Sequence, residues 1–403
     1  MKALVFKNVG NIAFQEVADP SLQEPSDVIV SLTASSICGT DLHAVRGTMS
    51  GMKSGTILGH EGIGIIKQKG EHVKTFAVGD RVIIPSTIGC GFCHYCTIEL
   101  YSQCDNANPN GPTEGTAFYG GPQSTGPFHG LQAEQARVPY ADANLIKIPE
   151  NLSDKQVLLL SDILPTAYQA VEYIEPSKDD SVAVFGCGPV GQLVIACLKE
   201  QGIQQIFAID RVKSRLQMAQ AQGAKTINFD EIEPVAELRK LTKNRGPKKI
   251  IDAVGIDAEA SRCCHLPFFK RLFKKTHFKE EIKEVAPHAN PQGNLWQPGG
   301  APSQVFQWGV QSIAKGGIFS IIGVYTELMR FFPIGEVMEK NLTIRAGNCN
   351  HRKYIPLLLP KVQDGTFDLA SFITHEVPFK NVVEAYEHFD KKEDNWIKVL
   401  LRM

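Results

Sequence analysis

The chain has 403 residues, a length that suits two domains better than one. Hydrophobic residues make up 43% of it and charged residues 21%, which is ordinary for a soluble globular protein with two cores. The formal net charge of −1 excludes a global electrostatic field that would recruit nucleic acid or an anionic membrane.

The start of the chain bears on where the protein resides. Residues 1–14 read MKALVFKNVGNIAF and lack the continuous apolar core of a secretory signal peptide. No apolar stretch approaches the ~20 residues that span a bilayer. We therefore expect a cytoplasmic protein without a membrane partner, whose cysteines stay reduced.

The N-terminal third predicts β structure. Val28, Val30 and Leu32 mark the apolar face of a buried strand. Residues 62–70 and 78–85 predict further strands, bounded by glycine and aspartate. Residues 105–130 are rich in Gly, Pro and Asn and predict a long irregular loop of the kind that is often functional.

Four of the ten cysteines lie within residues 89–104, GCGFCHYCTIELYSQC. Their C-x2-C-x2-C-x7-C spacing in a reducing compartment favours a metal over disulfides. Four thiolates at ~2.3 Å from a zinc ion would place the sulfurs roughly 3.8 Å apart. The alternative, a redox pair, would use only two of them. Because four thiolates close the coordination shell, we expect a structural zinc held by Cys90, Cys93, Cys96 and Cys104.

From residue 163 onward, strands alternate with helices, which predicts a parallel sheet. Residues 181–210 read as strand, glycine turn, helix and strand, and residues 248–255 and 316–324 predict two more buried strands. The segment 256–302 interrupts this rhythm. Its apolar residues at helical spacing predict an amphipathic helix: Phe268, Phe269, Leu272 and Phe273. The basic residues between them could face an anionic partner or a membrane surface. Packing on the protein itself or on a sister subunit is favoured, because Glu280, Glu281 and Glu284 follow and largely cancel that charge.

The glycine turn carries a dinucleotide-binding pattern. Gly186, Gly188 and Gly191 form G-x-G-x-x-G between a strand and a helix, and the next strand ends in Asp210. Such glycines let the backbone approach a pyrophosphate at the helix N-terminus. The carboxylate of Asp210 would accept hydrogen bonds from ribose hydroxyls and repel a 2′-phosphate, which favours NAD over NADP. Arg211 could soften that preference, and a βαβ unit without nucleotide is the alternative.

Cys38 and His60 each lie beside glycine or other small residues. Alone, each would be an ordinary buried side chain, but together they resemble two ligands of a second zinc. A catalytic zinc takes three protein ligands and keeps a fourth position open. Composition leaves the third ligand open among the carboxylates.

Residues 59–73, GHEGIGIIKQKGEHV, fit G-H-E-x2-G-x5-G-x2-V. With the cysteine cluster and the GCGPVG turn, the chain resembles zinc-dependent medium-chain alcohol dehydrogenases along nearly its whole length. Residues 160–168, 321–335, 341–347 and 389–394 are similar to the glutathione-independent formaldehyde dehydrogenase branch. The resemblance implies an α/β protein. On this resemblance we expect a β-rich GroES-like catalytic domain from residues 1–162 and 349–403 and a doubly wound Rossmann domain from residues 163–348. We expect the active site to lie in the cleft between them.

The resemblance also implies residue roles. Cys38, His60 and Asp162 would ligate the catalytic zinc, with Glu61 behind it; the alternative for Asp162 is a helix N-cap. Thr40 would pass a proton through the cofactor ribose to His43, an imidazole near solvent. The alternative is that the Thr40 hydroxyl only satisfies a turn. Cofactor contacts, to which Thr40 and His43 also belong, would be made by Gly39, Val190, Arg215, Val254, Gly323 and Gly347.

The implied reaction passes hydride between NAD and a small alcohol or aldehyde hydrate, with two zinc ions per chain. If NADH stayed bound, the enzyme could be an aldehyde dismutase. We expect a homo-oligomer, guessed to be a tetramer, and no nucleic-acid partner. Two alternatives are a dehydrogenase of ordinary primary or secondary alcohols or polyols, and a non-catalytic zinc- or nucleotide-binding protein. Where relatives often carry Gly-Gln-Thr-His, residues 347–350 read GNCN, a difference near the expected substrate.

Overall fold

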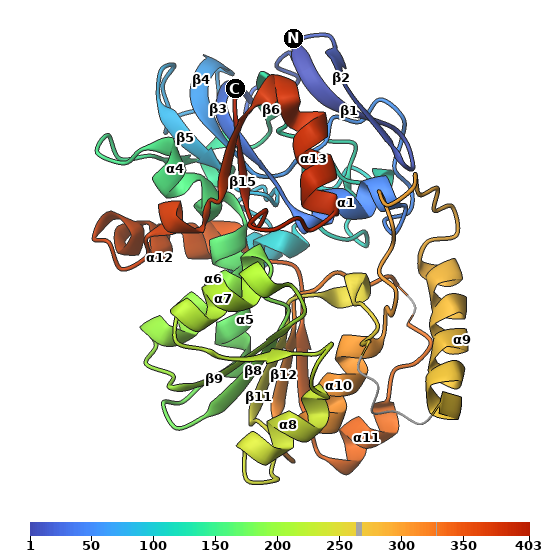
Figure 1. Cartoon of the computed structure of the whole chain (residues 1–403). Coiled ribbons are helices and arrows are strands. Elements are labelled where there is room, and N and C mark those ends of the chain that lie inside the picture. Colours follow the sequence, from blue (N-terminus) through green and yellow to red (C-terminus); the bar gives the residue numbers. More distant parts are fainter. Residues whose placement is uncertain (263–267, 328) are drawn as a thin grey trace. The chain divides into compact units, whose positions relative to one another are not determined.

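A computed structural model describes residues 1–262, 268–327 and 329–403 (Figure 1). The chain forms two compact units. The first comprises Met1–Thr166, His288–Trp296 and Asn348–Met403, and the second comprises Ala167–Pro287 and Gln297–Gly347. Within the described residues, no helix is both long and apolar enough to cross a membrane.

The first unit is built around a seven-stranded sheet, which confirms its predicted β character. Its central strand β3 pairs antiparallel with β4, β15 and β6, and the path of the sheet runs β14-β15-β3-β4-β5-β7. The strands are β3 (Val28–Ile37), β4 (Gly62–Lys69), β5 (Arg81–Ile84), β6 (Gln135–Val138), β7 (Ile146–Lys147), β14 (His375–Pro378) and β15 (Val399–Arg402).

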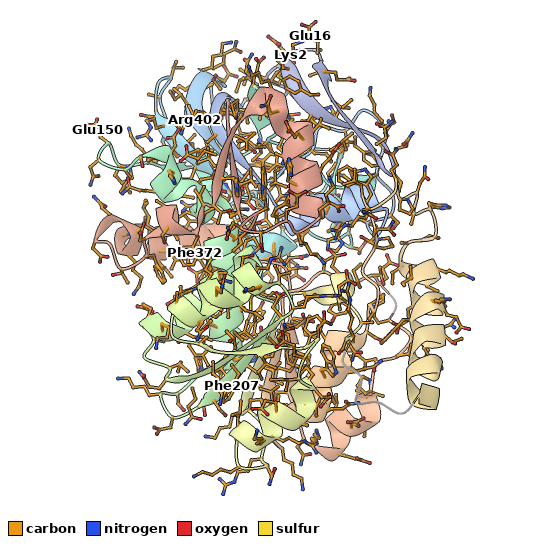
Figure 2. All side chains as sticks on the ribbon, in the orientation of Figure 1. Lys2, Glu16, Glu150, Phe207, Phe372 and Arg402 are labelled. Carbon is orange, nitrogen blue, oxygen red and sulfur yellow. The ribbon has the colours of Figure 1, made fainter. Side chains whose placement is uncertain are left out.

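A two-stranded ribbon, β1 (Lys2–Asn8) and β2 (Asn11–Glu16), belongs to the same unit. Lys2 and Glu16 face each other at its open end, where they form an exposed ion pair of 3.0 Å (Figure 2). The helices of the unit are α1 (Gly39–Arg46), α2 (His94–Thr97), α3 (Ala141–Asn144), α4 (Asp154–Val157), α12 (His351–Gln363) and α13 (Val382–Asp390). Short 3-10 turns occupy Tyr101–Gln103, Gln123–Thr125, Leu158–Ser161, Leu369–Phe372 and Phe379–Asn381.

The predicted apolar face of β3 is buried. Val28, Val30 and Leu32 share one core cluster with Val82 and Ile84 of β5. Burial of each such side chain stabilises the fold by about 1.5–3 kcal/mol. The predicted loop 105–130 is irregular apart from its one 3-10 turn.

The second unit carries a six-stranded parallel sheet in the order β10-β9-β8-β11-β12-β13. Numbered from its own first strand, this is 3-2-1-4-5-6, the doubly wound Rossmann order, so the predicted fold class is confirmed. The strands are β8 (Ser181–Phe185), β9 (Gln205–Asp210), β10 (Lys225–Asn228), β11 (Lys249–Asp252), β12 (Ile318–Ile321) and β13 (Thr343–Ala346).

Helices accompany this sheet, as the alternating pattern predicts. Leu238 of α8 and Phe306 of α10 share one apolar core with Phe207, Ile250 and Phe319 of the strands. The helices are α6 (Pro189–Glu200), α7 (Lys213–Ala221), α8 (Pro234–Leu241), α9 (Phe268–Val285), α10 (Gln304–Ser312) and α11 (Ile334–Glu339), with a 3-10 turn at Gly255–Asp257. Helix α5 (Ile163–Ile174) contains the boundary between the two units.

The compact units differ from the predicted domain ranges. The first unit extends to Thr166 rather than ending at 162. It also includes residues 288–296, which lie within the range predicted for the nucleotide domain. Residues 288–296 belong to the first unit because buried hydrogen bonds attach Trp296 to it. The backbone N–H of Trp296 donates to Asp390 Oδ2 at 2.8 Å, and Asp390 Oδ1 pairs with the buried guanidinium of Arg46.

Helix α9 lies where the segment 256–302 predicts a helix. The apolar side chains on which that prediction rests lie outside the described part of the structure, so the packing of their face stays a prediction: Phe268, Phe269, Leu272 and Phe273.

Candidate functional site

Antiparallel pairing brings two candidate metal ligands together. Ser35 of β3 pairs with Gly62 of β4, so the end of β3 lies beside the start of β4. Cys38 follows β3 as the N-cap residue of α1, and His60 lies two residues before β4. Residues 22 positions apart in the chain therefore share one end of the sheet.

Asp162 reaches the same place from another segment. It follows the 3-10 turn Leu158–Ser161, which is fixed to the sheet because Ser86 N–H donates to Ser161 O at 2.9 Å. Its Oδ2 lies 3.3 Å from His60 Nε2 and 3.8 Å from Cys38 Sγ.

Donor atoms of Cys38, His60, Glu61 and Asp162 all lie within 4.8 Å of one another. We call these four residues the CHED cluster. All four are buried, with at most 9% of each residue exposed. One thiolate, one imidazole and a carboxylate match the ligand types that zinc takes in proteins, so the donor set fits a zinc ion.

The orientation of His60 is fixed from behind. Its Nδ1 lies 3.2 Å from Asp41 Oδ1, which directs Nε2 toward the CHED cluster. Asp41 Oδ2 in turn accepts from the backbone N–H of Cys38 at 2.9 Å and from Gln132 Nε2 at 3.3 Å. Burial would lower the pKa of His60, but the negative charges of Asp41 and Cys38 raise it well above its usual value. Sequence reasoning missed Asp41, although Cys38-x-x-Asp41 has capping-box spacing.

Glu61 leaves one oxygen unused. Its Oε1 pairs with Lys398 Nζ at 2.6 Å, and Lys398 also donates to Ile37 O at 3.1 Å. Glu61 Oε2 is buried and has no hydrogen-bond partner among the described residues. A buried orphan oxygen beside three donors is what a cation would satisfy. Burial raises the pKa of Glu61, while the Lys398 ammonium opposes the rise.

The side-chain contacts of Asp162 bear on whether it is a ligand or a helix cap. Its Oδ1 lies 2.8 Å from His351 Nε2 and accepts from Thr166 Oγ1 at 3.1 Å. These partners are side chains, whereas an N-cap accepts a backbone N–H. Burial opposes the ionised form, yet His351 and His60 hold the pKa of Asp162 well below its usual value. For His351, burial lowers the pKa but Cys349 and Asp162 raise it to about 10.

Both residues of the predicted proton relay lie in helix α1 of the first unit. Thr40 Oγ1 lies 3.8 Å from Cys38 Sγ in the first turn of α1. His43 does not lie near solvent as predicted: it is 3% exposed, and its Nδ1 lies 2.7 Å from Thr48 Oγ1. The reason is that α1 is buried at every position from Asp41 to Arg46.

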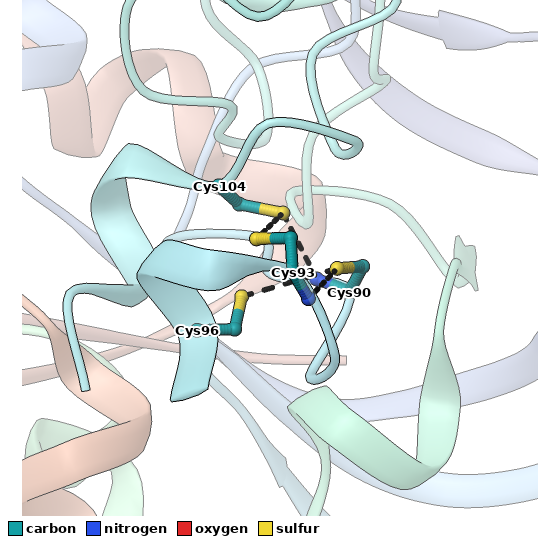
Figure 3. Close-up of side chains that lie close together, drawn as sticks. All are labelled: Cys90, Cys93, Cys96 and Cys104. Atoms are coloured by element: carbon teal, nitrogen blue, oxygen red, sulfur yellow. Dashed lines mark hydrogen bonds between the residues drawn. The ribbon is translucent and has the colours of Figure 1, made fainter. Parts of the chain in front are cut away.

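The four lobe cysteines converge as their spacing predicts (Figure 3). The Sγ atoms of Cys93 and Cys104 are 3.8 Å apart and those of Cys90 and Cys96 are 4.0 Å apart, too far for disulfides and close to the edge of a zinc tetrahedron. Backbone N–H groups of Cys90 and Cys93 and the amide of Asn106 point at these sulfurs. The Cys96 contact lowers the pKa of Cys104 to about 5, which favours a thiolate.

The glycine turn of the second unit has the close packing that its pattern predicts. A Cβ on Gly191 would lie 1.9 Å from Gly186 O, and Gly186 itself has a φ of +88°. Gly188 is the N-cap of α6, and Val190 lies in the first turn of that helix. Arg215 Nη1 would lie 3.8 Å from a Cβ on Gly188, so its guanidinium borders the turn.

Asp210 ends β9 with a fully engaged carboxylate. Its Oδ2 accepts from the backbone N–H of Cys187 at 2.8 Å, and its Oδ1 accepts from the backbone N–H groups of Arg211 and Val212. The Arg211 side chain pairs with Asp230 at 2.9 Å and lies over the Phe229 ring. Arg211, which could soften the predicted preference for NAD, is thus paired with another carboxylate.

Two of the predicted nicotinamide contacts, Val254 and Gly323, follow the neighbouring strands β11 and β12. A Cβ on Gly323 would lie 2.1 Å from Gly255 N, so the loops after β11 and β12 touch. Asp252 accepts from the backbone N–H groups of Val254 and Gly255, and Tyr325 Oη donates to it at 2.6 Å. Gly347 follows β13 in the second unit, whereas Gly39 opens α1 in the first.

Comparison with known proteins agrees with this geometry. Residues 24–150 match the "Alcohol dehydrogenase GroES-like domain" family and residues 189–266 the "Zinc-binding dehydrogenase" family. The "Uncharacterized zinc-type alcohol dehydrogenase-like protein AdhB" of Bacillus subtilis is 33% identical over 406 residues, covering all of both chains. The "Glutathione-independent formaldehyde dehydrogenase" of Pseudomonas aeruginosa is 31% identical over 270 residues, covering 64% of this chain and 66% of the relative.

Among solved structures, "Alcohol dehydrogenase TADH from Thermus sp. ATN1" is 32% identical with a TM-score of 0.80, covering 100% of this chain and 99% of the other. The full-length match to AdhB and the two family matches fall on the units that carry the CHED cluster and the glycine turn. The chain therefore belongs to the zinc-dependent medium-chain alcohol dehydrogenase family.

Proposed function

We propose that this oxidoreductase transfers hydride between a small alcohol or aldehyde hydrate and NAD, with a catalytic zinc held by Cys38, His60 and Asp162. The observation that carries the proposal is the CHED cluster itself. It brings three donors of zinc-binding type together in a buried site, with an orphan oxygen of Glu61 beside them. Bound zinc would polarise the substrate oxygen, and bound NAD would accept the hydride that no side chain can take up.

The protein's own residues would prepare the substrate and remove its proton. Asp41 fixes the imidazole of His60, and Lys398 holds one oxygen of Glu61, so the donors keep their positions without substrate. Thr40 has a hydroxyl in the first turn of α1, near Cys38, where it can accept a hydrogen bond from a substrate hydroxyl. From Thr40 the proton would pass through the ribose of bound NAD to His43, whose buried imidazole has its Nδ1 2.7 Å from Thr48 Oγ1.

The cofactor is proposed to be NAD rather than NADP. Three backbone hydrogen bonds hold the carboxylate of Asp210 at the end of β9, where it would accept hydrogen bonds from ribose hydroxyls and repel a 2′-phosphate. Arg211 cannot neutralise a phosphate without leaving Asp230. Gly186, Gly188, Val190, Gly191 and Arg215 border the proposed pyrophosphate site, and the other proposed contacts are Gly39, Val254, Gly323 and Gly347.

A second zinc is proposed at the cysteine lobe, which gives two zinc ions per chain. Its four sulfurs leave no open position, so this ion would hold the loop and take no part in the reaction. We also propose a cytoplasmic homo-oligomer. Strand β13 is an edge strand, and a second copy could extend its sheet.

The substrate can be tested directly. Labelled formaldehyde is incubated with the purified protein and NAD without glutathione, and the carbon products are followed by NMR. Formate would support the aldehyde branch, and formate with equal methanol would support dismutation. Unchanged formaldehyde, with NADH formed from ethanol, a secondary alcohol or a polyol, would support an ordinary alcohol dehydrogenase. That second candidate is favoured by the full-length similarity to TADH, which is named an alcohol dehydrogenase. A protein that turns over none of these contradicts the proposal.

A further inference from the structure

The two oxygens of Asp162 face different neighbours. Oδ2 lies 3.3 Å from His60 Nε2 and 3.8 Å from Cys38 Sγ, inside the CHED cluster. Oδ1 lies 2.8 Å from His351 Nε2 and accepts from Thr166 Oγ1 at 3.1 Å. One oxygen is therefore directed at the other donors, and its twin is held by hydrogen bonds.

His351 is itself held at both ring nitrogens. It opens α12, is 2% exposed, and has its Nδ1 3.0 Å from Thr87 Oγ1. The Thr87 hydroxyl lies 3.4 Å from Cys349 O. A buried imidazole tied at Nδ1 and Nε2 cannot rotate without breaking one of these contacts, so it can set the direction of the carboxylate that it meets.

His351 stands outside the group of donors that converge within 4.8 Å. Its Nε2 meets Asp162 Oδ1, whereas Oδ2 is the oxygen near Cys38 and His60. This places His351 behind the proposed ligand rather than among the ligands. Thr166 shares that position, because its Oγ1 lies 3.4 Å from His351 Nε2.

We propose that His351 is a positioning residue that, with Thr166, restricts Asp162 to one-oxygen coordination of the metal. The proposal rests on the proposed function, since it takes the CHED cluster to hold zinc. A carboxylate can bind a metal through one or both oxygens. Two-oxygen binding would fill the coordination position that a catalytic zinc keeps open for substrate. Hydrogen bonds to Oδ1 fix rotation of the carboxylate and keep that position available.

The test compares His351→Ala with His351→Gln, whose Nε2 can replace the imidazole Nε2 as donor. Zinc loss to a chromogenic chelator is followed in each purified protein. We expect about 10–100-fold weaker retention of one zinc in His351→Ala, and retention within a few-fold of wild type in His351→Gln. Zinc at Cys90, Cys93, Cys96 and Cys104 should leave at the same slow rate in all proteins and serves as the internal reference.

Cobalt substitution gives a second readout that a packing defect would not move. The visible absorption of cobalt(II) is more intense in four-coordinate than in five-coordinate sites. We expect a weaker band in His351→Ala, a smaller change in the same direction in Thr166→Val, and the wild-type band in His351→Gln. His375→Gln is the matched control, because His375 stacks on Trp396 at 4.0 Å and does not contact Asp162.

Equal zinc retention and equal cobalt spectra in His351→Ala and wild type would overturn the proposal. So would a folded His351→Gln that behaves like His351→Ala, because the hydrogen bond would then be irrelevant. If His351→Ala does not fold, Thr166→Val and His351→Gln still decide. A wild-type protein that holds zinc at the four cysteines alone would instead refute the proposed function.

Discussion

At the scale of single residues, the ion pair between Glu61 and Lys398 combines near-complete burial with a large separation in the sequence. The two groups are 0% and 1% exposed and 337 residues apart. The sequence around each residue does not predict the other as its partner. Both charges can be buried because they pair with each other and because Lys398 also donates a hydrogen bond to Ile37 O.

Removal of one partner should therefore be costly. Lys398→Met leaves Glu61 as an uncompensated buried charge and should lower the free energy of unfolding by about 3–5 kcal/mol. Urea denaturation of the zinc-loaded protein measures the change. The double variant Lys398→Met, Glu61→Gln removes both charges and should recover most of the loss. A double variant no more stable than Lys398→Met would contradict this account.

In the proposed cofactor site, the choice between NAD and NADP should depend on Asp210. Asp210→Ser would remove the carboxylate proposed to face the ribose 2′ position and would weaken hydrogen bonds that are worth about 1.5–3 kcal/mol when charged. The ratio of kcat/KM for NAD to that for NADP should fall about 10–100-fold. Steady-state kinetics with both cofactors check this. Asp230→Asn is the control for Arg211: it frees that guanidinium while leaving Asp210 intact, and should raise activity with NADP more than it lowers activity with NAD.

At the scale of elements, the turn between β8 and α6 is fixed by contacts that admit no side chain. A Cβ on Gly191 would meet Gly186 O at 1.9 Å, whereas a Cβ on Gly335 in α11 would meet nothing within 4 Å. The same substitution should thus have opposite results at the two glycines, because one is a point of close backbone approach and the other a solvent-facing helix position.

Gly191→Ala should weaken NADH binding at least 10-fold and lower the melting temperature, since the helix must move away from the turn. Gly335→Ala should leave binding unchanged and stabilise slightly, as alanine has the higher helix propensity. Fluorescence titration with NADH and thermal unfolding measure both effects. Unchanged binding in Gly191→Ala would show that the turn does not hold the cofactor.

At the scale of the whole molecule, the proposed metal sites and the proposed nucleotide site belong to different compact units. The CHED cluster and the cysteine lobe lie in the first unit, and the glycine turn with Asp210 lies in the second. Each unit has its own sheet and its own core. Loss of metal from the first unit should therefore leave the folding of the second intact.

Brief treatment with a chelator should remove the zinc proposed at the CHED cluster first, because a catalytic zinc site would keep an open position. Activity should be lost while the dissociation constant for NADH stays within about 2-fold of its starting value. Zinc content, activity and NADH fluorescence are measured on the same sample, and added zinc should restore activity. Parallel loss of NADH affinity would show that the nucleotide site depends on the metal site.

The sequence by itself determined the features that are local in the chain. The glycine turn, the cysteine spacing and the alternation of strands and helices each lie within about 30 residues, and each predicted its structure correctly because backbone geometry and hydrophobic burial act over that range. Cys38 and His60 could be paired from their surroundings, but Asp162 as a third partner came only from the family resemblance.

Tertiary structure alone decided which distant side chains complete the site. Asp41 behind His60, Lys398 beside Glu61 and His351 behind Asp162 come together only through the pairing of β3 with β4 and β15 and through the start of α12. The burial of His43 likewise depends on how helix α1 packs in the fold. Hydrogen bonds between side chains depend on position in space, and a pattern along the chain records spacing without recording which segments meet.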